Sequence, residues 1–442
     1  MSDEQSTRAF PASLEVQRKA HELIPGGAHT YSKGDDQFPE CAPLFIERGK
    51  GCHAWDIEGN EFIEYGMGLR AVTLGHGFEP VVEAAYRQMQ RGTNFTRPAR
   101  IEVEAAEEFL RFVEGADMVK FAKNGSDVTT AAVKLARAYT NRDMIAVCAD
   151  HPFFSTDDWF IGTMEMNAGI PRAVADLTLE FLYNDLASLA DLFDRHPGSI
   201  ACVVMEAEAS TQPNPGYLQQ VKDLCEQRGA VLIFDEMITG FRWHLGGAQK
   251  FHEVTPHLST FGKALGNGFA ISALAGKREI MRLGGLYHDQ PRVFLLSTTH
   301  GAETHALAAA IATMHTYAEQ GVVEFLWQQG ELLRKLIERS VQEHRLGGYF
   351  EVTGRPCNLI YATRDESAER SQSFRALFMQ EMIRRGVIAP SFVVSFSHSD
   401  EDIHHTATGV HEALAIYRKA LDEGVEKYLQ GRPVKPVDRR FN

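Results

Sequence analysis

VLIFDEMITGFR, residues 231–242, begins as a short apolar, β-branched run and ends that run in two carboxylates, Asp235 and Glu236. A run of this kind predicts a strand of a parallel sheet that is buried on both faces. Ligands of open α/β sheets bind in the crevice outside the carboxyl ends of the strands. We therefore expect a parallel sheet that carries the Asp235 carboxylate to a binding crevice.

The stretch TFGKALGNG, residues 260–268, places Lys263 among apolar residues and glycines. Taken singly, the two stretches are equally compatible with an acid that supports a surface turn and a lysine that reaches solvent from a strand end. Taken together they favour pyridoxal phosphate, because a buried lysine amine loses its proton and forms a Schiff base with an aldehyde. A carboxylate such as Asp235 keeps the pyridine nitrogen protonated, so that the ring accepts electrons. The glycines leave room for a planar group beside the backbone.

Composition and charge exclude several classes of protein. The 442 residues carry a formal net charge of −14 and no basic tract, which argues against a nucleic-acid partner. No apolar run approaches the length of a membrane span, and the polar start MSDEQSTRAF lacks the order of a secretory signal. The six cysteines are scattered without CxxC pairs, as in a reducing compartment. We expect a cytoplasmic protein with neither a nucleic-acid nor a membrane partner.

Apolar periodicity indicates where strands and helices alternate. Residues 43–68 predict three short strands in an antiparallel meander outside the main sheet. From residue 118 the alternation is regular, with strands at 118–122, 144–149, 199–209, 231–235 and 269–276. Further strands are expected at 346–354, 358–364 and 387–397.

This alternation predicts an α/β protein with three segments. The large domain, 71–320, holds a mainly parallel central sheet. The N-terminal segment, 1–70, packs with the C-terminal segment, 321–442, in a smaller α+β domain built from both termini.

Two turns rich in hydroxyl groups precede predicted helices. Gly125 and Ser126 follow the strand at 118–122, and backbone amides at a positive helix end suit a phosphate. An ordinary N-cap made by Ser126 or Asp127 is the alternative. Thr298, in STTHG at 297–301, allows the same two interpretations. The pattern GxxxxGK[ST] is absent from both turns, so binding of a nucleoside triphosphate has no support.

Other candidate residues have less specific surroundings. Phe153 or its neighbour Phe154 either stacks on a flat cofactor or packs in the core. Tyr31 and Lys33 stand in a glycine-rich polar loop that either covers a surface or binds substrate. Residues 163–171 predict a loop, which is a candidate lid.

Six motifs follow one another along the chain: IPGG at 24–27, LFIERGKG with WDIEGNEFIEY, LGH at 74–76, NGSD, LIFDEMITGFR and FGKALGNG. Together they resemble, in order, the motifs of the class-III aminotransferases, which are fold-type-I pyridoxal phosphate enzymes. Within that group the chain is most similar to glutamate-1-semialdehyde aminomutase. The resemblance extends from IPGG to roughly the final helix and implies the same fold and cofactor.

The resemblance also implies a role for individual residues. Lys263 is then the Schiff-base lysine and proton shuttle, and Asp235 pairs with the pyridinium nitrogen. Gly125 and Ser126 hold the phosphate, and Phe153 occupies the position of the aromatic residue that stacks on the ring.

Two further implications concern the ring hydroxyl and the oligomer. Glu206, near the end of the strand at 199–209, lies in the segment that flanks the cofactor's ring hydroxyl. Thr298 falls at the threonine that reaches a phosphate in the other subunit, which implies a homodimer with the active site shared across the interface.

The chain departs from the aminomutase pattern at the substrate end. Lys33 stands where the aminomutase has an arginine that clamps the substrate carboxylate, and a point charge does not replace a bidentate fork. Tyr31 shares that loop, Leu69 replaces a tryptophan, and Ala302-Glu303 replaces Asn-Pro. These departures favour a small-molecule acceptor other than the aminomutase's own substrate.

Three functions are therefore compatible with the sequence. The first is an aminotransferase that moves an amino group from a donor, glutamate being expected, to a carbonyl acceptor. The second is an aminomutase that moves the amino group within one substrate on the way to tetrapyrroles. The third is a non-catalytic dimeric binding scaffold, which the retained Lys263 and Asp235 disfavour.

Overall fold

The computed structural model describes residues 11–151 and 153–441, which form two compact units. Unit 1 takes the chain up to Leu69, Thr73–Phe78 and Glu324–Arg439, and unit 2 takes Arg70–Val72, Glu79–Val323 and the residues after Arg439. Unit 1 thus joins both ends of the chain. The division of the chain into domain segments 1–70, 71–320 and 321–442 stays a prediction.

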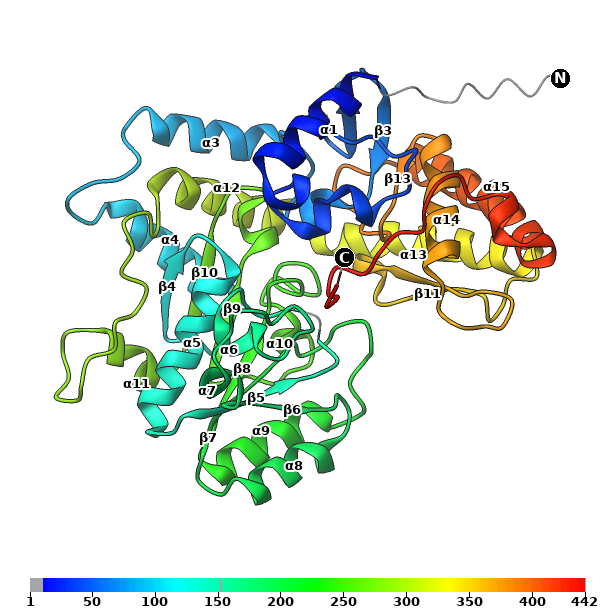
Figure 1. Ribbon diagram of the computed structural model, residues 1–442. Coiled ribbons are helices and arrows are strands. Elements are labelled where there is room, and N and C mark those ends of the chain that lie inside the picture. The colour runs from blue at the N-terminus through cyan, green and yellow to red at the C-terminus, as the bar shows by residue number, and fades with distance from the viewer. Residues whose placement is uncertain (1–10, 152, 442) are drawn as a thin grey trace. The chain divides into compact units, whose positions relative to one another are not determined.

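Unit 2 is organised on a seven-stranded sheet (Figure 1). In spatial order its strands are β4 (Met118–Ala122), β10 (Ser272–Gly276), β9 (Leu258–Phe261), β8 (Val231–Asp235), β7 (Ile200–Met205), β5 (Met144–Cys148) and β6 (Thr178–Phe181). β10 runs antiparallel to both of its neighbours, and the remaining neighbouring pairs are parallel. The carboxyl ends of six strands therefore meet at one edge of the sheet.

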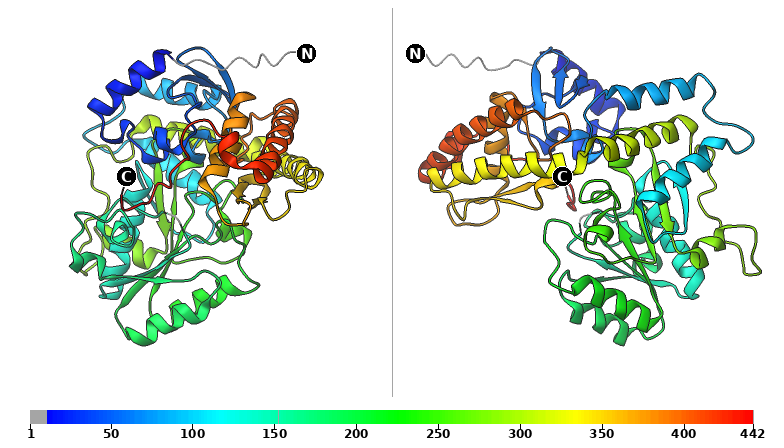
Figure 2. Two further views of the ribbon diagram at one scale, coloured as in Figure 1. Left: turned by 45° about the vertical axis from the view of Figure 1, so that its right-hand side comes forward. Right: turned by 180° about the vertical axis from the view of Figure 1, so that it is seen from behind.

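Helices cover this sheet, as they do in parallel sheets generally. α5 (Gly125–Thr140) packs across β10, β9, β8 and β7, and every residue of β7 and β8 is buried. α8 (Leu186–Arg195) and α9 (Tyr217–Arg228) lie side by side in all views (Figures 1 and 2). The other helices of unit 2 are α3 (Glu79–Met89), α4 (Arg100–Phe112), α6 (Asp158–Ile161), α7 (Arg172–Ala175), α10 (Ala248–Phe251), α11 (Arg278–Met281) and α12 (Thr304–Gln320).

Unit 1 contains the predicted antiparallel meander, which the structure confirms. β1 (Ile46–Lys50), β2 (His53–Asp56) and β3 (Glu61–Glu64) pair antiparallel in a sheet of their own. A fourth strand, β13 (Val387–Ile388), joins β3 in parallel, with Ile63 N donating to Gly386 O at 2.8 Å. This pairing ties the N-terminal segment to the C-terminal segment within one sheet.

The C-terminal part of unit 1 adds helices and a small second sheet. Its elements are β11 (Phe350–Thr353), paired antiparallel with β12 (Ile360–Thr363), α14 (Gln372–Arg384) and α15 (Asp400–Glu423). Unit 1 also contains α1 (Pro11–Leu23) and most of α13 (Val322–Glu343). The boundary between the two units falls in the first turn of α13. A four-residue turn labelled α2 (Met67–Arg70) has left-handed residues inside it.

The predicted strands differ from the structure in three places, and the first is the strand expected at 199–209, which ends at Met205. The strand predicted at 387–397 is wrong beyond Ile388, because Pro390 cannot donate to a ladder and the later residues are irregular. β6 was not predicted, because four residues with one buried side chain give no periodic signal. The fold class itself is confirmed: a large unit with a mainly parallel sheet and a smaller α+β unit from both termini.

No helix within residues 11–151 or 153–441 has the length and apolar character that crossing a membrane requires.

Candidate functional site

Asp235 ends β8 at the carboxyl edge of the sheet. The side chain is 2% exposed, and its Oδ1 accepts hydrogen bonds from Met237 N at 2.9 Å and from Thr260 Oγ1 at 3.3 Å. Burial raises the pKa of this carboxyl to about 6, against the opposing effect of the Lys263 charge. Both protein hydrogen bonds fall on Oδ1, so Oδ2 is the oxygen that can receive a further donor.

Lys263 begins a 3-10 turn (Lys263–Gly266) directly after β9 and Gly262. Its backbone has φ +44°, a left-handed conformation that a residue other than glycine adopts at a cost of about 1–3 kcal/mol. The turn is held from outside, because the Tyr317 hydroxyl donates to Ala264 O at 2.9 Å. Burial lowers the pKa of the Lys263 amine, while the carboxylates of Asp235 and Glu206 favour its charged form.

Glu206 follows β7 and shares this environment. Its backbone N–H donates to His151 Nδ1 at 2.9 Å, and its side chain is buried. Burial, and after it the charge of Asp235, raises the pKa of Glu206 to about 8. The structure therefore brings two buried carboxylates and one half-buried amine together where β7, β8 and β9 end.

Two arginines that the sequence analysis did not single out add positive charge here. The charges of Arg70 and Arg242 both lower the pKa of Lys263, and Arg242 Nη2 donates to Arg70 O at 3.3 Å. Arg242 is fully buried, and burial lowers the pKa of Arg70 to about 10. The available sequence signal for Arg242 was its position at the end of the LIFDEMITGFR motif. Arg70 has φ +72°, which no sequence pattern announces.

The predicted phosphate turn lies at the start of α5. Asn124, not Ser126, is the N-cap, and the Asp127 carboxylate accepts from Asn124 Nδ2 at 2.9 Å, so the capping interpretation of Ser126 is wrong. Ser126 Oγ instead accepts from Thr156 N at 3.0 Å and keeps its own hydrogen for another acceptor. The first-turn amides at Gly125 and Ser126 have no acceptor within the helix. This end of a 16-residue helix suits a phosphate.

Met237 explains why glycines are needed at two positions around the site. A Cβ on Gly125 would lie 3.1 Å from Met237 Sδ, and a Cβ on Gly262 would lie 2.7 Å from the same atom. The thioether thus packs directly against both backbones. It joins the end of β8 to the turn before α5 and to the turn that carries Lys263.

The structure separates the two phenylalanines after β5. Phe154 is 3% exposed and belongs to the main core of unit 2, whereas Phe153 is 49% exposed and contacts Phe160 edge-on. Phe153 is therefore the one available for stacking. Its stacking role stays a prediction.

Thr298 lies on an exposed segment that is anchored to unit 2 at both sides. Asn94 Nδ2 donates to Thr299 O at 2.9 Å, and Lys123 Nζ pairs with Glu303 at 2.7 Å. The segment is thus held in place while the Thr298 side chain faces outward.

The predicted substrate residues lie in unit 1. Tyr31 and Lys33 are exposed in a 3-10 turn (Tyr31–Lys33), and their role stays a prediction. Asp35 and Asp36 of the same loop have protein partners: Gln17 Nε2 lies 2.5 Å from Asp35, and Arg439 Nη2 lies 2.5 Å from Asp36. Residues 163–171 join α6 to α7, and their action as a lid also stays a prediction.

Comparison with known proteins agrees with this geometry. The model of the family "Aminotransferase class-III" matches residues 32–414. The chain belongs to the class-III aminotransferases.

Curated relatives of this class-III aminotransferase carry more than one activity in their names. The chain is 30% identical over 420 residues to 3-aminobutyryl-CoA aminotransferase of Cloacimonas acidaminovorans (strain Evry), covering 92% of this chain and 98% of the relative. It is also 30% identical over 434 residues to glutamate-1-semialdehyde 2,1-aminomutase 2 of Bacillus cereus (strain AH820), covering 92% and 99%.

Among solved structures, the PLP form of the FumI protein of Sphingopyxis sp. MTA144 has a TM-score of 0.84 and 26% identity, covering 93% of this chain and 97% of that one. The predicted family, fold type, enzymatic nature and cofactor are therefore confirmed. Pyridoxal phosphate fits the residues present, because Asp235 offers a buried acceptor and Lys263 a half-buried amine of lowered pKa beside a helix start suited to phosphate.

Proposed function

We propose that the chain is an aminotransferase that moves an amino group from a separate donor, glutamate being the first candidate, to a small-molecule carbonyl acceptor. The observation that carries the proposal is the convergence of Asp235, Glu206 and Lys263 at the ends of three neighbouring strands. Pyridoxal phosphate, when bound, supplies an aldehyde that condenses with amines and a ring that withdraws electrons from the adjoining carbon.

In this proposal each residue of the site has a definite task. Lys263 Nζ holds the aldehyde carbon and, when released, removes and returns the proton on the reacting carbon of the substrate. Its lowered pKa supports that task, because a base must be neutral near the working pH. Asp235 Oδ2 accepts the ring N–H and keeps that nitrogen positive. Glu206, with its raised pKa, is available to share a proton with the ring hydroxyl.

The phosphate and the ring face have their own residues. Gly125 and Ser126 hold the phosphate through first-turn amides and the Ser126 hydroxyl. Phe153 covers one face of the ring. Thr298 reaches the phosphate of the partner subunit in a homodimer, which its outward position supports. The six cysteines are free thiols, which supports a cytoplasmic location.

Two experiments test this proposal. Lys263→Ala is expected to abolish turnover and the near-visible absorbance of the lysine-bound cofactor, whereas Lys250→Ala, an exposed lysine, leaves both unchanged. Incubation with glutamate alone is expected to release 2-oxoglutarate in an amount equal to the enzyme.

The second candidate is an intramolecular aminomutase, which the similarity to the Bacillus cereus aminomutase favours. It predicts no release of 2-oxoglutarate from glutamate and efficient turnover of glutamate-1-semialdehyde. These two results together would favour the aminomutase and contradict the aminotransferase.

A further inference from the structure

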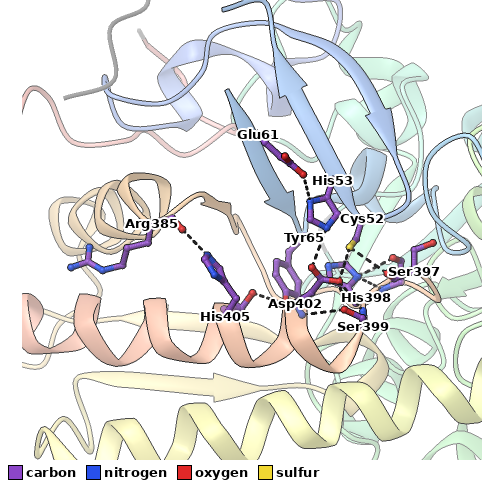
Figure 3. Close-up of polar contacts among 12 residues, drawn as sticks. Cys52, His53, Glu61, Tyr65, Arg385, Ser397, His398, Ser399, Asp402 and His405 are labelled. Carbon is purple, nitrogen blue, oxygen red and sulfur yellow. Dashed lines mark hydrogen bonds and ion pairs between the residues drawn. The ribbon is translucent and has the colours of Figure 1, made fainter. Parts of the chain in front are cut away.

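A second cluster of ionisable side chains lies in unit 1. The turn before β2 carries Cys52, β2 begins with His53, and the first turn of α15 carries Asp402 (Figure 3). Cys52 and Asp402 are 350 positions apart in the chain, yet Cys52 Sγ lies 3.4 Å from Asp402 Oδ2. His53 Nε2 lies 3.0 Å from Asp402 Oδ1, and one ligand atom of each residue lies within 4.8 Å of the others.

Both ring nitrogens of His53 face a carboxylate. Nδ1 lies 2.8 Å from Glu61 Oε1, and Nε2 lies 3.0 Å from Asp402 Oδ1. A neutral imidazole has one N–H, so it satisfies one of these carboxylates and turns a lone pair toward the other. One of the two carboxylates therefore faces a ring lone pair, and a cation bound between them would remove that repulsion.

We propose that Cys52 Sγ, His53 Nε2 and Asp402 Oδ1 bind one transition-metal dication, for which zinc is the best chemical match. Thiolate, imidazole and carboxylate are all zinc ligands. Tetrahedral bonds of normal length separate nitrogen from oxygen ligands by about 3.4 Å and sulfur from oxygen ligands by about 3.6 Å. The separation of His53 Nε2 from Asp402 Oδ1, 3.0 Å, lies within a few tenths of an ångström of the first value, and one ligand atom of each of the three residues lies within 4.8 Å of the others.

Residues around the three ligands orient them for this task. Glu61 Oε1 lies 2.8 Å from His53 Nδ1, and a carboxylate on that side favours the tautomer with the lone pair on Nε2, as is common for zinc-binding histidines. Ser399 donates to Asp402 Oδ2 from its backbone N at 2.9 Å and from its hydroxyl at 2.6 Å, which leaves Oδ1 for the metal.

His398, next to this cluster in Figure 3, is not a ligand. Its Nδ1 accepts the backbone N–H of Ser395 at 2.9 Å, so its proton resides on Nε2 and no lone pair remains there. The fourth position belongs to water, because the His53 side chain is 32% exposed.

Proton and charge are balanced in this site. Burial, and after it Asp402, raises the pKa of the Cys52 thiol far above its usual range without metal, and binding of the dication releases that thiol proton to solvent. One thiolate and one carboxylate then neutralise the two positive charges. The metal links the meander to α15 and so fastens the two ends of the chain within unit 1.

The test uses the purified holoenzyme after treatment with a chelator and dialysis. Cobalt(II) is added, and we expect one equivalent bound per chain, with the visible bands of a tetrahedral site and a thiolate charge-transfer band that zinc abolishes. Cys41→Ser, which removes another free thiol of unit 1, is expected to bind the same amount. Cys52→Ser and His53→Gln are expected to bind at least roughly tenfold more weakly, and Glu61→Gln roughly 10- to 100-fold more weakly.

Two results would overturn the proposal. One is equal cobalt binding by Cys52→Ser and the unchanged enzyme, and the other is no stoichiometric binding by the unchanged enzyme. The second result needs no variant, so misfolding of a variant leaves the test intact. Retention of pyridoxal phosphate in each variant reports on folding.

Discussion

Thr260 donates its hydroxyl hydrogen to Asp235 Oδ1 over 3.3 Å, and the two residues are register partners of the neighbouring parallel strands β8 and β9. Lys263 follows Thr260 by three positions. One pair of strands therefore fixes both the acid and the amine. Substitutions at this edge of the sheet are expected to show which side chains act in the chemistry and which act in stability.

Asp235→Asn keeps the shape of the side chain and removes its negative charge. We expect the variant to retain pyridoxal phosphate and to lose roughly 10²- to 10⁴-fold in kcat, because the ring nitrogen is no longer held positive. Steady-state kinetics and cofactor absorbance measure the two effects. An unchanged kcat would remove Asp235 from the site.

Glu236, the next residue, is expected to act on stability. Its buried carboxylate accepts from Ala248 N and Gln249 N, each at 2.7 Å, and from the Thr239 hydroxyl, so it caps the start of α10. Glu236→Ala leaves these donors buried without an acceptor and is expected to lower the free energy of unfolding by about 2–5 kcal/mol. Urea denaturation measures the change. Glu226→Ala, on the exposed side of α9, is the control and is expected to shift stability by less than about 1 kcal/mol.

Thr298→Ala is expected to weaken retention of pyridoxal phosphate without unfolding the chain. The side chain is exposed on an anchored segment, so its loss removes a contact and leaves the segment in place. Dialysis followed by a cofactor assay measures retention, and Thr299→Ala, at the neighbouring position, is the matched control. Equal loss from both variants would contradict a specific phosphate contact at Thr298.

His151 is expected to make stability depend on pH. Burial lowers the pKa of this histidine from 6.5 to about 4, so the unfolded chain takes up a proton at a higher pH than the folded one. The contribution of His151 to the free energy of unfolding is complete above pH 6.5 and is lost as the pH falls toward 4. The free energy of unfolding is expected to fall by about 2 kcal/mol between pH 7 and pH 5 for this reason. Denaturation at both pH values is expected to show a smaller loss in His151→Gln. His404→Gln, at an exposed position, should retain the full loss.

Local patterns were enough to predict the parts of the site that lie directly on or beside strands. The apolar run of β8 announced a buried parallel strand with Asp235 at its end, and the apolar residues and glycines around Lys263 singled out that lysine. Those two stretches together favoured pyridoxal phosphate, and the family motifs then implied the role of Glu206 beside the ring hydroxyl.

Features that depend on tertiary contacts were not accessible in this way. Arg70 belongs to the site through its left-handed backbone and the hydrogen bond from Arg242, neither of which has a periodic signature. The strand expected at 387–397 shortened to β13 because Pro390 interrupts the ladder with β3, a strand more than 300 positions away in the chain. Burial of Phe154 and exposure of Phe153 likewise follow from packing rather than from sequence order.

Because β10 runs antiparallel to β9, the connection between these two strands limits the insertions and deletions that the enzyme tolerates. Parallel neighbours are joined by long crossovers, and such crossovers absorb added or deleted residues without moving the strands. Residues 262–271, in contrast, turn straight back from β9 into its antiparallel neighbour. An insertion there would shift the amine away from its acid, so variation in substrate choice has to arise in other loops while this short return keeps its length.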